Sequence, residues 1–238
     1  MNIKNDIKKR IVGKIEIKNN FVVKGRKMEG VRKISLIPEI IDKHINAGIQ
    51  EFCVHDVVAS LYNTQIDLAT LNLTFSKIFY PITVGGGIHT IEHAHNLFQI
   101  GAEKLCINTG FARNSDLINS IAKIYGSQAI SFALDVRFIS ENFYCFFETA
   151  RETYEESIED LIRKIQDSGI GEIILTSIDR DGTNKGADTR ILEHVLQQTN
   201  VPVLYSGGIQ SIEDGKAINS QYSELSGVCV NSAIINNL

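Results

Sequence analysis

The sequence lacks several features that would place a protein in a broad class. It has no tryptophan and three prolines among its 238 residues. No run approaches the roughly 18 consecutive apolar residues of a membrane-spanning helix, and the polar start MNIKNDIKKR has no signal-peptide core. The net charge of −4 gives no reason to expect nucleic-acid binding. We therefore expect a cytoplasmic protein that binds neither membranes nor nucleic acid.

Metal and redox motifs are also missing. The chain has four scattered cysteines without CxxC spacing, Cys53, Cys106, Cys145 and Cys229. In a cytoplasmic protein they should be reduced and buried. His89 and His93 could share a helix face but lack a third ligand, so we expect them and His95 to be solvated at the surface. We expect no metal and no cofactor.

Short apolar runs alternate with longer amphipathic segments along the chain. Helical patterns are present at 38–47, 91–100, 115–124, 156–167 and 189–198. Strands alternating with such helices indicate a parallel sheet, and eight units indicate a closed (β/α)8 barrel. No linker divides residues 1–238, so we expect a single domain. The predicted strands are 11–17, 51–56, 81–84, 104–108, 129–135, 172–177, 202–205 and 227–231.

The second half of the chain repeats the first. PITVGGGIHTIE at 81–92 matches PVLYSGGIQSIE at 202–213, displaced by 121 residues. Glu16 in KIEIK matches Asp135 in ALDVR, displaced by 119. These ordered matches predict two fused half-barrels. Because the sequence ends at AIINNL, we expect the last helix to be short or missing, with the eighth strand exposed or covered by a partner. Two further matches are Glu51 with Glu172, and CIN at 106–108 with CVN at 229–231.

Each half carries a glycine-rich strand end, TVGGGI at 83–88 and YSGGI at 205–209. Glycine lets the backbone approach a ligand, and N–H groups there can surround an anion. Barrel phosphate sites are built from the loops after two adjacent strands. The duplicated pair therefore predicts a substrate with a phosphate at each end. The expected phosphate-binding residues are Gly86, Gly87, Asn108 and Thr109, and then Ser206, Gly207, Gly208, Asn231 and Ser232.

Charged residues stand at both ends of the predicted strands. Glu16 and Asp135 belong to opposite strands and should face the mouth, where two carboxylates suit general acid–base catalysis. Asp56, Thr176 and Asp181 are further candidates at this rim. At the other end, strand starts carry charges that could close a ring at the barrel floor; the alternative is ordinary surface charge. The floor residues are Arg10, Glu51, Lys104 and Glu172.

Several stretches together resemble a known family, the cyclase subunits of imidazole glycerol phosphate synthases. They are TVGGGI, GAEKLCINT, YGSQAISFALD, GEIILTSIDRDGTNKGAD and PVLYSGGI. The resemblance covers nearly the whole chain and implies a (β/α)8 barrel enzyme, a lyase-type synthase of histidine biosynthesis. It implies a heterodimer whose glutaminase partner docks on the N-terminal barrel face and supplies ammonia. The ammonia reacts with a bisphosphorylated ribulosyl nucleotide, giving imidazole glycerol phosphate and an aminoimidazole carboxamide ribonucleotide.

The resemblance also implies roles for individual residues. Glu16 and Asp135 would be the acid–base pair, and Lys24 in VVKG would be a further catalytic residue. Asp181 and Gly182 in LTSIDRDGT would bind substrate. The floor ring would be a gate for ammonia.

Strand 1 departs from the family pattern, which has Asp at position 16 and a small residue, commonly Cys, at position 14. On a strand, Lys14 and Glu16 share a face. A buried ammonium needs a partner, and Glu16 is the nearest candidate, with Asp135 next. Such a pair would neutralise the base and obstruct the ammonia path. Two alternatives therefore stay open: a secondary paralogue delivering ammonia for surface-sugar amidation, and a non-catalytic scaffold that activates a glutaminase.

Overall fold

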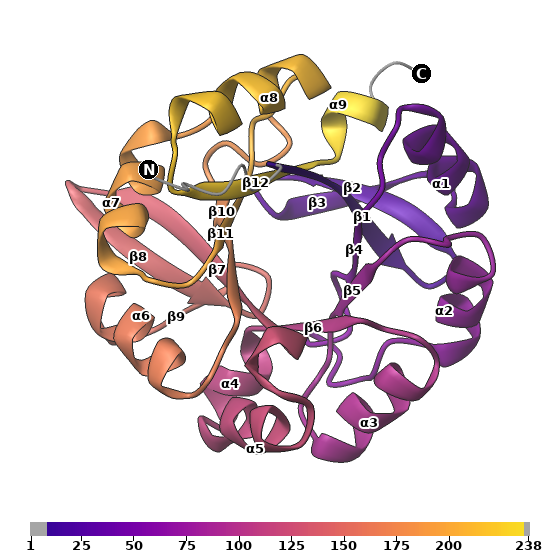
Figure 1. Ribbon diagram of the computed structural model, residues 1–238, viewed down its shortest axis with the longest axis horizontal. Helices are drawn as coiled ribbons and strands as arrows, with labels where there is room; N and C mark the ends of the chain where they lie inside the picture. Colours follow the sequence, from indigo (N-terminus) through magenta and orange to yellow (C-terminus); the bar gives the residue numbers. More distant parts are fainter. Residues whose placement is uncertain (1–8, 236–238) are drawn as a thin grey trace, which may run out of the picture.

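The computed structural model describes residues 9–235, except for the side chain of Ser232. Its strands close into a ring that is surrounded by helices (Figure 1). The eight barrel strands are β1 (Arg10–Lys18), β4 (Phe52–Asp56), β5 (Ile82–Gly85), β6 (Lys104–Ile107), β7 (Ile130–Ile139), β10 (Glu172–Ser177), β11 (Val203–Ser206) and β12 (Leu225–Val230). They are parallel in the order β10-β11-β12-β1-β4-β5-β6-β7, and β10 pairs with β7 to close the ring. The predicted (β/α)8 barrel and its eight strands are confirmed.

The predicted helices are present on the outside of the barrel. In α6, the buried residues Ile158, Leu161, Ile162 and Ile165 follow helical spacing and form the face that packs inward. The Ser157 side chain accepts a hydrogen bond from the Asp160 N–H and begins that helix. The helices are α1 (Ile37–Asn46), α2 (Leu68–Phe75), α3 (Ile91–Gln99), α4 (Thr109–Arg113), α5 (Asp116–Tyr125), α6 (Ile158–Asp167), α7 (Thr189–Gln198), α8 (Ile212–Gln221) and α9 (Ser232–Ile235), with a 3-10 turn at Ser127–Ala129. No helix within residues 9–235 has the length and apolar character needed to cross a membrane.

Two excursions that the sequence analysis did not predict follow β1 and β7. After β1, strands β2 (Phe21–Arg26) and β3 (Glu29–Leu36) form an antiparallel hairpin. After β7, β8 (Asn142–Phe147) and the short β9 (Glu152–Thr153) extend the sheet in the same antiparallel manner. Both start from corresponding strands of the two halves, at the C-terminal ends of the barrel strands. They therefore add walls to the mouth of the barrel.

The strand register repeats between the two halves. Glu16 on β1 pairs with His55 on β4, and Asp135 on β7 pairs with Thr176 on β10. His55 then pairs with Gly85, just as Thr176 pairs with Ser206 on the next strand. Because β1 and β7 are four strands apart in a ring of eight, Glu16 and Asp135 lie on opposite walls. The predicted half-barrel repeat is consistent with this register.

A small apolar layer fills the barrel interior between its floor and its mouth. It consists of Val12, Cys53, Cys106, Ile174, Leu204 and Cys229, with Ala133 packed against it. All four cysteines are free and buried, as predicted. The expectation that the eighth strand is exposed or needs a partner is wrong. Residues 227–230 of β12 are buried, because α8 of the same chain packs on the strand. In the described part of the chain, α9 after β12 is short, as expected.

Candidate active site

The charged residues at the floor form one connected ion-paired network. Arg10 Nη1 lies 3.0 Å from Glu51 Oε1, and the same guanidinium pairs with Glu172. Lys104 Nζ lies 3.4 Å from Glu172 Oε1, which also accepts a hydrogen bond from Ser131 at 3.0 Å. Glu172 and Ser131 are buried, whereas Arg10 and Lys104 are partly exposed. The four predicted floor residues are therefore linked in the order Glu51–Arg10–Glu172–Lys104, and closure of this chain into a ring stays a prediction.

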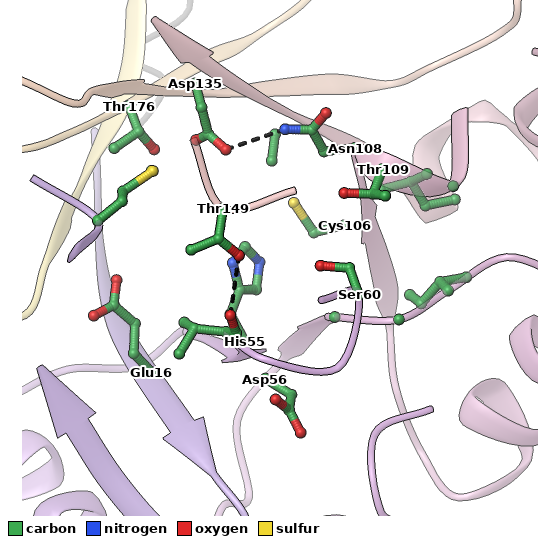
Figure 2. Close-up of a pocket in the computed structure, with 18 of the residues that line it drawn as sticks. Glu16, His55, Asp56, Ser60, Cys106, Asn108, Thr109, Asp135, Thr149 and Thr176 are labelled. Atoms are coloured by element: carbon green, nitrogen blue, oxygen red, sulfur yellow. Dashed lines mark hydrogen bonds between the residues drawn. The ribbon is translucent and has the colours of Figure 1, made fainter. Parts of the chain in front are cut away.

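A cavity of about 120 Å³ lies at the opposite end of the barrel. Its lining combines residues from several strand ends with residues from the loops that follow them (Figure 2). The ionisable side chains in this lining include Lys14, Glu16, His55, Asp135 and Asp181. Carboxyl ends of barrel strands are where (β/α)8 enzymes carry their chemistry.

Lys14 and Glu16 form the ion pair predicted from strand alternation. Lys14 Nζ lies 3.5 Å from Glu16 Oε1, and both residues are buried, with exposures of 5% and 8%. Burial opposes the Lys14 charge, but the carboxylates of Glu16, Asp181 and Asp135 outweigh it and raise the pKa of Lys14. Burial raises the pKa of Glu16 despite the opposing effect of Lys14. The lysine thus keeps its proton, while Glu16 holds its proton more tightly than an ordinary glutamate.

Asp135 stands on the opposite wall and is held by Asn108. Asn108 Nδ2 donates to Asp135 Oδ2 at 3.1 Å, the contact drawn in Figure 2, and to the Phe146 carbonyl at 2.9 Å. The Tyr154 hydroxyl donates to Asn108 Oδ1 at 2.9 Å. Burial raises the pKa of Asp135 to about 6, although Lys14 and Asn108 act against it. The Asn108 amide, predicted to bind phosphate, here orients a carboxylate.

The first glycine-rich turn opens onto the cavity. Gly86, Gly87 and Thr109 line it together with Arg113 of α4. Gly86 has φ of 112°, and a Cβ there would lie 2.4 Å from the Asp56 carbonyl oxygen, so only glycine fits. Thr109 Oγ1 accepts from the Glu148 N–H at 3.0 Å, and within residues 9–235 its own O–H has no acceptor, so it can donate to a ligand.

The second glycine-rich turn does not reach this cavity. Ser206, Gly207 and Gly208 are buried, and the Gly186 N–H donates to the Gly208 carbonyl at 2.9 Å. A Cβ on Gly208 would lie 2.2 Å from the Gly186 oxygen. Asn231 Oδ1 is buried without a hydrogen-bond partner in residues 9–235, and the Ser232 side chain lies outside the described part of the chain. Phosphate binding by this turn stays a prediction.

Asp181 and Gly182 hold the tip of the β2–β3 hairpin over the mouth. The Asp181 carbonyl accepts from the Lys27 N–H at 2.9 Å, and Asp181 Oδ2 accepts from the Met28 N–H at 3.2 Å. A Cβ on Gly182 would lie 2.4 Å from the Gly25 oxygen. Lys24, on β2, is buried and is not among the residues that line the cavity. Its pKa is lowered, chiefly by burial and then by Arg32.

The structure adds two ionisable residues to the site, His55 and Arg113, and corrects another prediction. His55 lines the cavity, and the alternation Glu51-x-Cys53-x-His55 was the signal that could have placed it on the inner face. The prediction that His93 is solvated is wrong: it is 1% exposed, with Nδ1 3.2 Å from the Gly87 oxygen, and it buttresses the glycine turn. Among residues 9–235 no group of three or more His, Cys, Asp or Glu is arranged to hold a metal ion.

Comparison with known proteins gives consistent matches. The histidine biosynthesis protein family model matches residues 10–237. Imidazole glycerol phosphate synthase subunit HisF of Chlorobium phaeovibrioides is 36% identical over 205 residues, covering 86% of this chain and 82% of the relative. The same subunit of Pelodictyon phaeoclathratiforme is 37% identical over 206 residues, with coverages of 86% and 82%. That of Legionella pneumophila is 34% identical over 206 residues, with coverages of 86% and 97%.

Proposed function

This chain belongs to the histidine biosynthesis protein family, and we propose that it is the cyclase subunit of an imidazole glycerol phosphate synthase. In that role it is a lyase-type enzyme of histidine biosynthesis that works with a glutaminase subunit. The observation that carries the proposal is the mouth cavity, which brings the opposed carboxylates Glu16 and Asp135 beside a glycine-rich anion site. A ribulosyl nucleotide with a phosphate in that site would place its sugar between the two carboxylates.

The two carboxyl groups suit different roles: Asp135 suits that of a general base and Glu16 that of a general acid. Asp135, with a pKa of about 6, is ionised near neutral pH and can accept a proton. Glu16 has its pKa raised by burial and can hold a proton that it donates to a leaving oxygen or nitrogen. Environments that separate the pKa values of two carboxyl groups are the usual basis for such a division of roles. Asn108 keeps Asp135 in place during the transfer.

The first glycine turn supplies the anion site. Gly86 and Gly87 have no side chains of their own between their backbone and the cavity, and the Thr109 hydroxyl can donate to a phosphate there. Arg113 adds a positive charge at the rim; its Nη1 donates to Asn63 Oδ1 at 3.0 Å, and it pairs with Glu148. These groups suit a phosphate ester better than a neutral sugar. A second phosphate would need the turn at Gly207 to be uncovered.

We further propose that the glutaminase docks on the floor face and that ammonia enters through the floor ring. Phe79, in the loop just before β5, lies on this face and is 91% exposed. Exposed aromatic side chains are frequent anchors in protein interfaces. Ammonia entering through the network of Arg10 and Glu172 would cross the thiol-lined layer around Cys106 and reach Lys14 in the cavity lining.

The Lys14–Glu16 pair favours a second candidate, a paralogue that passes ammonia to another acceptor. It ties the Glu16 carboxylate to a cation within the reaction cavity. The test is turnover of the bisphosphorylated ribulosyl nucleotide by this chain alone, at high pH and high ammonium, which bypasses the partner and the floor. Turnover that is lost in Asp135→Asn supports the cyclase. Nucleotide binding without turnover would favour the non-catalytic scaffold, and no binding would favour the paralogue.

A further inference from the structure

His55 is an ionisable side chain in the cavity to which the proposed acid–base pair gives no task. It lies on β4 beside Glu16 in the strand register, and its ring packs over Gly85. A Cβ on Gly85 would lie 2.5 Å from His55 Cδ2 and 2.6 Å from Nε2. The Cδ2–Nε2 edge of the imidazole is therefore turned toward the barrel wall, and glycine at position 85 makes room for it. Figure 2 shows the ring among the cavity-lining side chains.

The two ring nitrogens have different surroundings. Nε2 lies 3.3 Å from Cys53 Sγ. Burial raises the pKa of the Cys53 thiol well above its ordinary value, so the sulfur keeps its proton. A neutral imidazole nitrogen is a better acceptor than a thiol sulfur, so S–H···Nε2 is the favoured direction. With Nε2 accepting, the ring proton is on Nδ1, and Nδ1 has no hydrogen-bond partner within residues 9–235 of the chain.

Burial and the Lys14 ammonium keep the ring neutral. Lys14 and Glu16 on β1, Asp135 on β7 and Asp181 after β10 line the same cavity. Burial, followed by the Lys14 ammonium, lowers the pKa of His55 to about 3. A ring that does not protonate in the physiological range is a poor general base. It is a suitable neutral hydrogen-bond donor, since it adds no charge that the substrate must offset.

We propose that His55 is a further catalytic residue that contacts the substrate, donating its Nδ1–H to the oxygen of the carbonyl group whose carbon the ammonia attacks; the new C–N bond forms as the C=O π pair moves to that oxygen. The assignment rests on the proposed function, because a ribulosyl group supplies the carbonyl. Glu16 is paired with Lys14 on the same wall, whereas the His55 Nδ1–H has no hydrogen-bond partner within residues 9–235. As the nitrogen nucleophile adds, negative charge develops on that oxygen. A fixed donor then stabilises the transition state more than the ground state. Cys53 acts as a positioning residue, because its thiol selects the tautomer.

Kinetic variants test the contact in the ammonium-dependent reaction. His55→Leu keeps the volume but removes the donor, and kcat should fall about 100-fold with a smaller change in KM. His55→Asn places an amide N–H near the position of Nδ1 and should keep kcat within about tenfold of the unmodified chain. His95→Leu is the matched control, because His95 is exposed on α3, away from the cavity, and its ring Nδ1 lies 2.6 Å from the Tyr125 hydroxyl. Its kcat should be unchanged.

A 15N spectrum of the histidine-labelled full chain gives a readout independent of turnover. The His55 signals, identified by their loss in His55→Leu, should show a protonated Nδ1 and a bare Nε2 from pH 5 to 8. In Cys53→Ala this tautomer preference should weaken. Adding the ribulosyl nucleotide should shift the Nδ1 signal.

The outcomes separate this inference from the proposed function. If the unmodified chain turns the nucleotide over and the His55→Leu variant is equally active, the role of His55 is refuted and the proposed function stands. A protonated Nε2, or a ring that titrates like an ordinary histidine, also overturns it. If the unmodified chain shows no turnover, the proposed function fails, and the nucleotide titration decides: a shifted Nδ1 signal supports the contact, and an unchanged signal refutes it.

Discussion

Replacing Lys14 with methionine should destabilise the protein in a way that depends on pH. The substitution removes the ammonium but leaves a flexible apolar chain of similar length in the barrel interior. Glu16, 8% exposed, then loses the partner that lies 3.5 Å from its carboxylate. Removing one member of a buried ion pair costs about 3–5 kcal/mol when the other stays charged. The remaining carboxyl group can avoid part of this cost by taking up a proton.

The sign of the pH dependence follows from the direction of the Glu16 shift. Burial raises the folded-state pKa of Glu16, and loss of Lys14 raises it further. An acid with a raised folded-state pKa stabilises the fold below its unfolded pKa, and this contribution is lost as pH rises toward the folded value. The unmodified chain, in which the pKa of Glu16 is already about 7, shows the same dependence up to that value, so the difference between the two proteins grows by about 1.4 kcal/mol for each pH unit above it. The loss of unfolding free energy should therefore be about 1 kcal/mol at pH 5.5 and about 3–4 kcal/mol at pH 8.5.

Urea unfolding followed by circular dichroism at the two pH values measures this difference. The double variant Lys14→Met/Glu16→Gln should recover most of the loss at pH 8.5, because no buried charge remains. Lys104→Met is the matched control. Its ion pair has a similar 3.4 Å distance, but Lys104 is partly exposed and Glu172 keeps Arg10 and Ser131 as partners. That change should cost at most about 1 kcal/mol, with little dependence on pH.

Equal destabilisation at both pH values would refute this reasoning, as would additive effects of the Lys14 and Glu16 changes. Either result would mean that the lysine contributes by packing its chain rather than by balancing a buried carboxylate.

Three further perturbations test other parts of the site. Asp135 has a pKa of about 6, so ammonium-dependent kcat should rise with pH through that value; Asp135→Asn should abolish this limb and lower kcat at least about 100-fold. Gly86→Ala puts a Cβ 2.4 Å from the Asp56 oxygen at φ of 112° and should cost about 1–3 kcal/mol in urea unfolding and raise KM; unchanged stability and KM would contradict the tight turn. Asp181→Ala removes the bond to the Met28 N–H, so exchange of that amide should accelerate while unfolding free energy falls by about 1 kcal/mol; unchanged exchange would show that the hairpin tip is held elsewhere.

The sequence determined the barrel because its signals are local. A buried parallel strand needs a short apolar run, and a covering helix needs one apolar face, so both can be recognised within a few residues. The period of two along β1 placed Lys14 and Glu16 on one face and predicted their ion pair. The displacement that relates Glu16 to Asp135 predicted two carboxylates on opposite walls.

Tertiary structure decided which other residues these side chains and turns contact. Antiparallel excursions such as β2–β3 depend on loop contacts, among them the bonds from Asp181, which lies far along the chain. The two glycine-rich turns have similar sequences, but only the first lines the cavity. A backbone oxygen packs closely against the last glycine of each, Thr64 O at Gly87 and Gly186 O at Gly208, so the difference comes from the loops around the turns rather than from the glycines. The His55 ring is likewise positioned by tertiary contacts, because Cys53 Sγ lies beside its Nε2 and the missing side chain of Gly85 leaves room for it. Such contacts join residues distant in sequence, and periodicity, which is a property of neighbours, does not encode them.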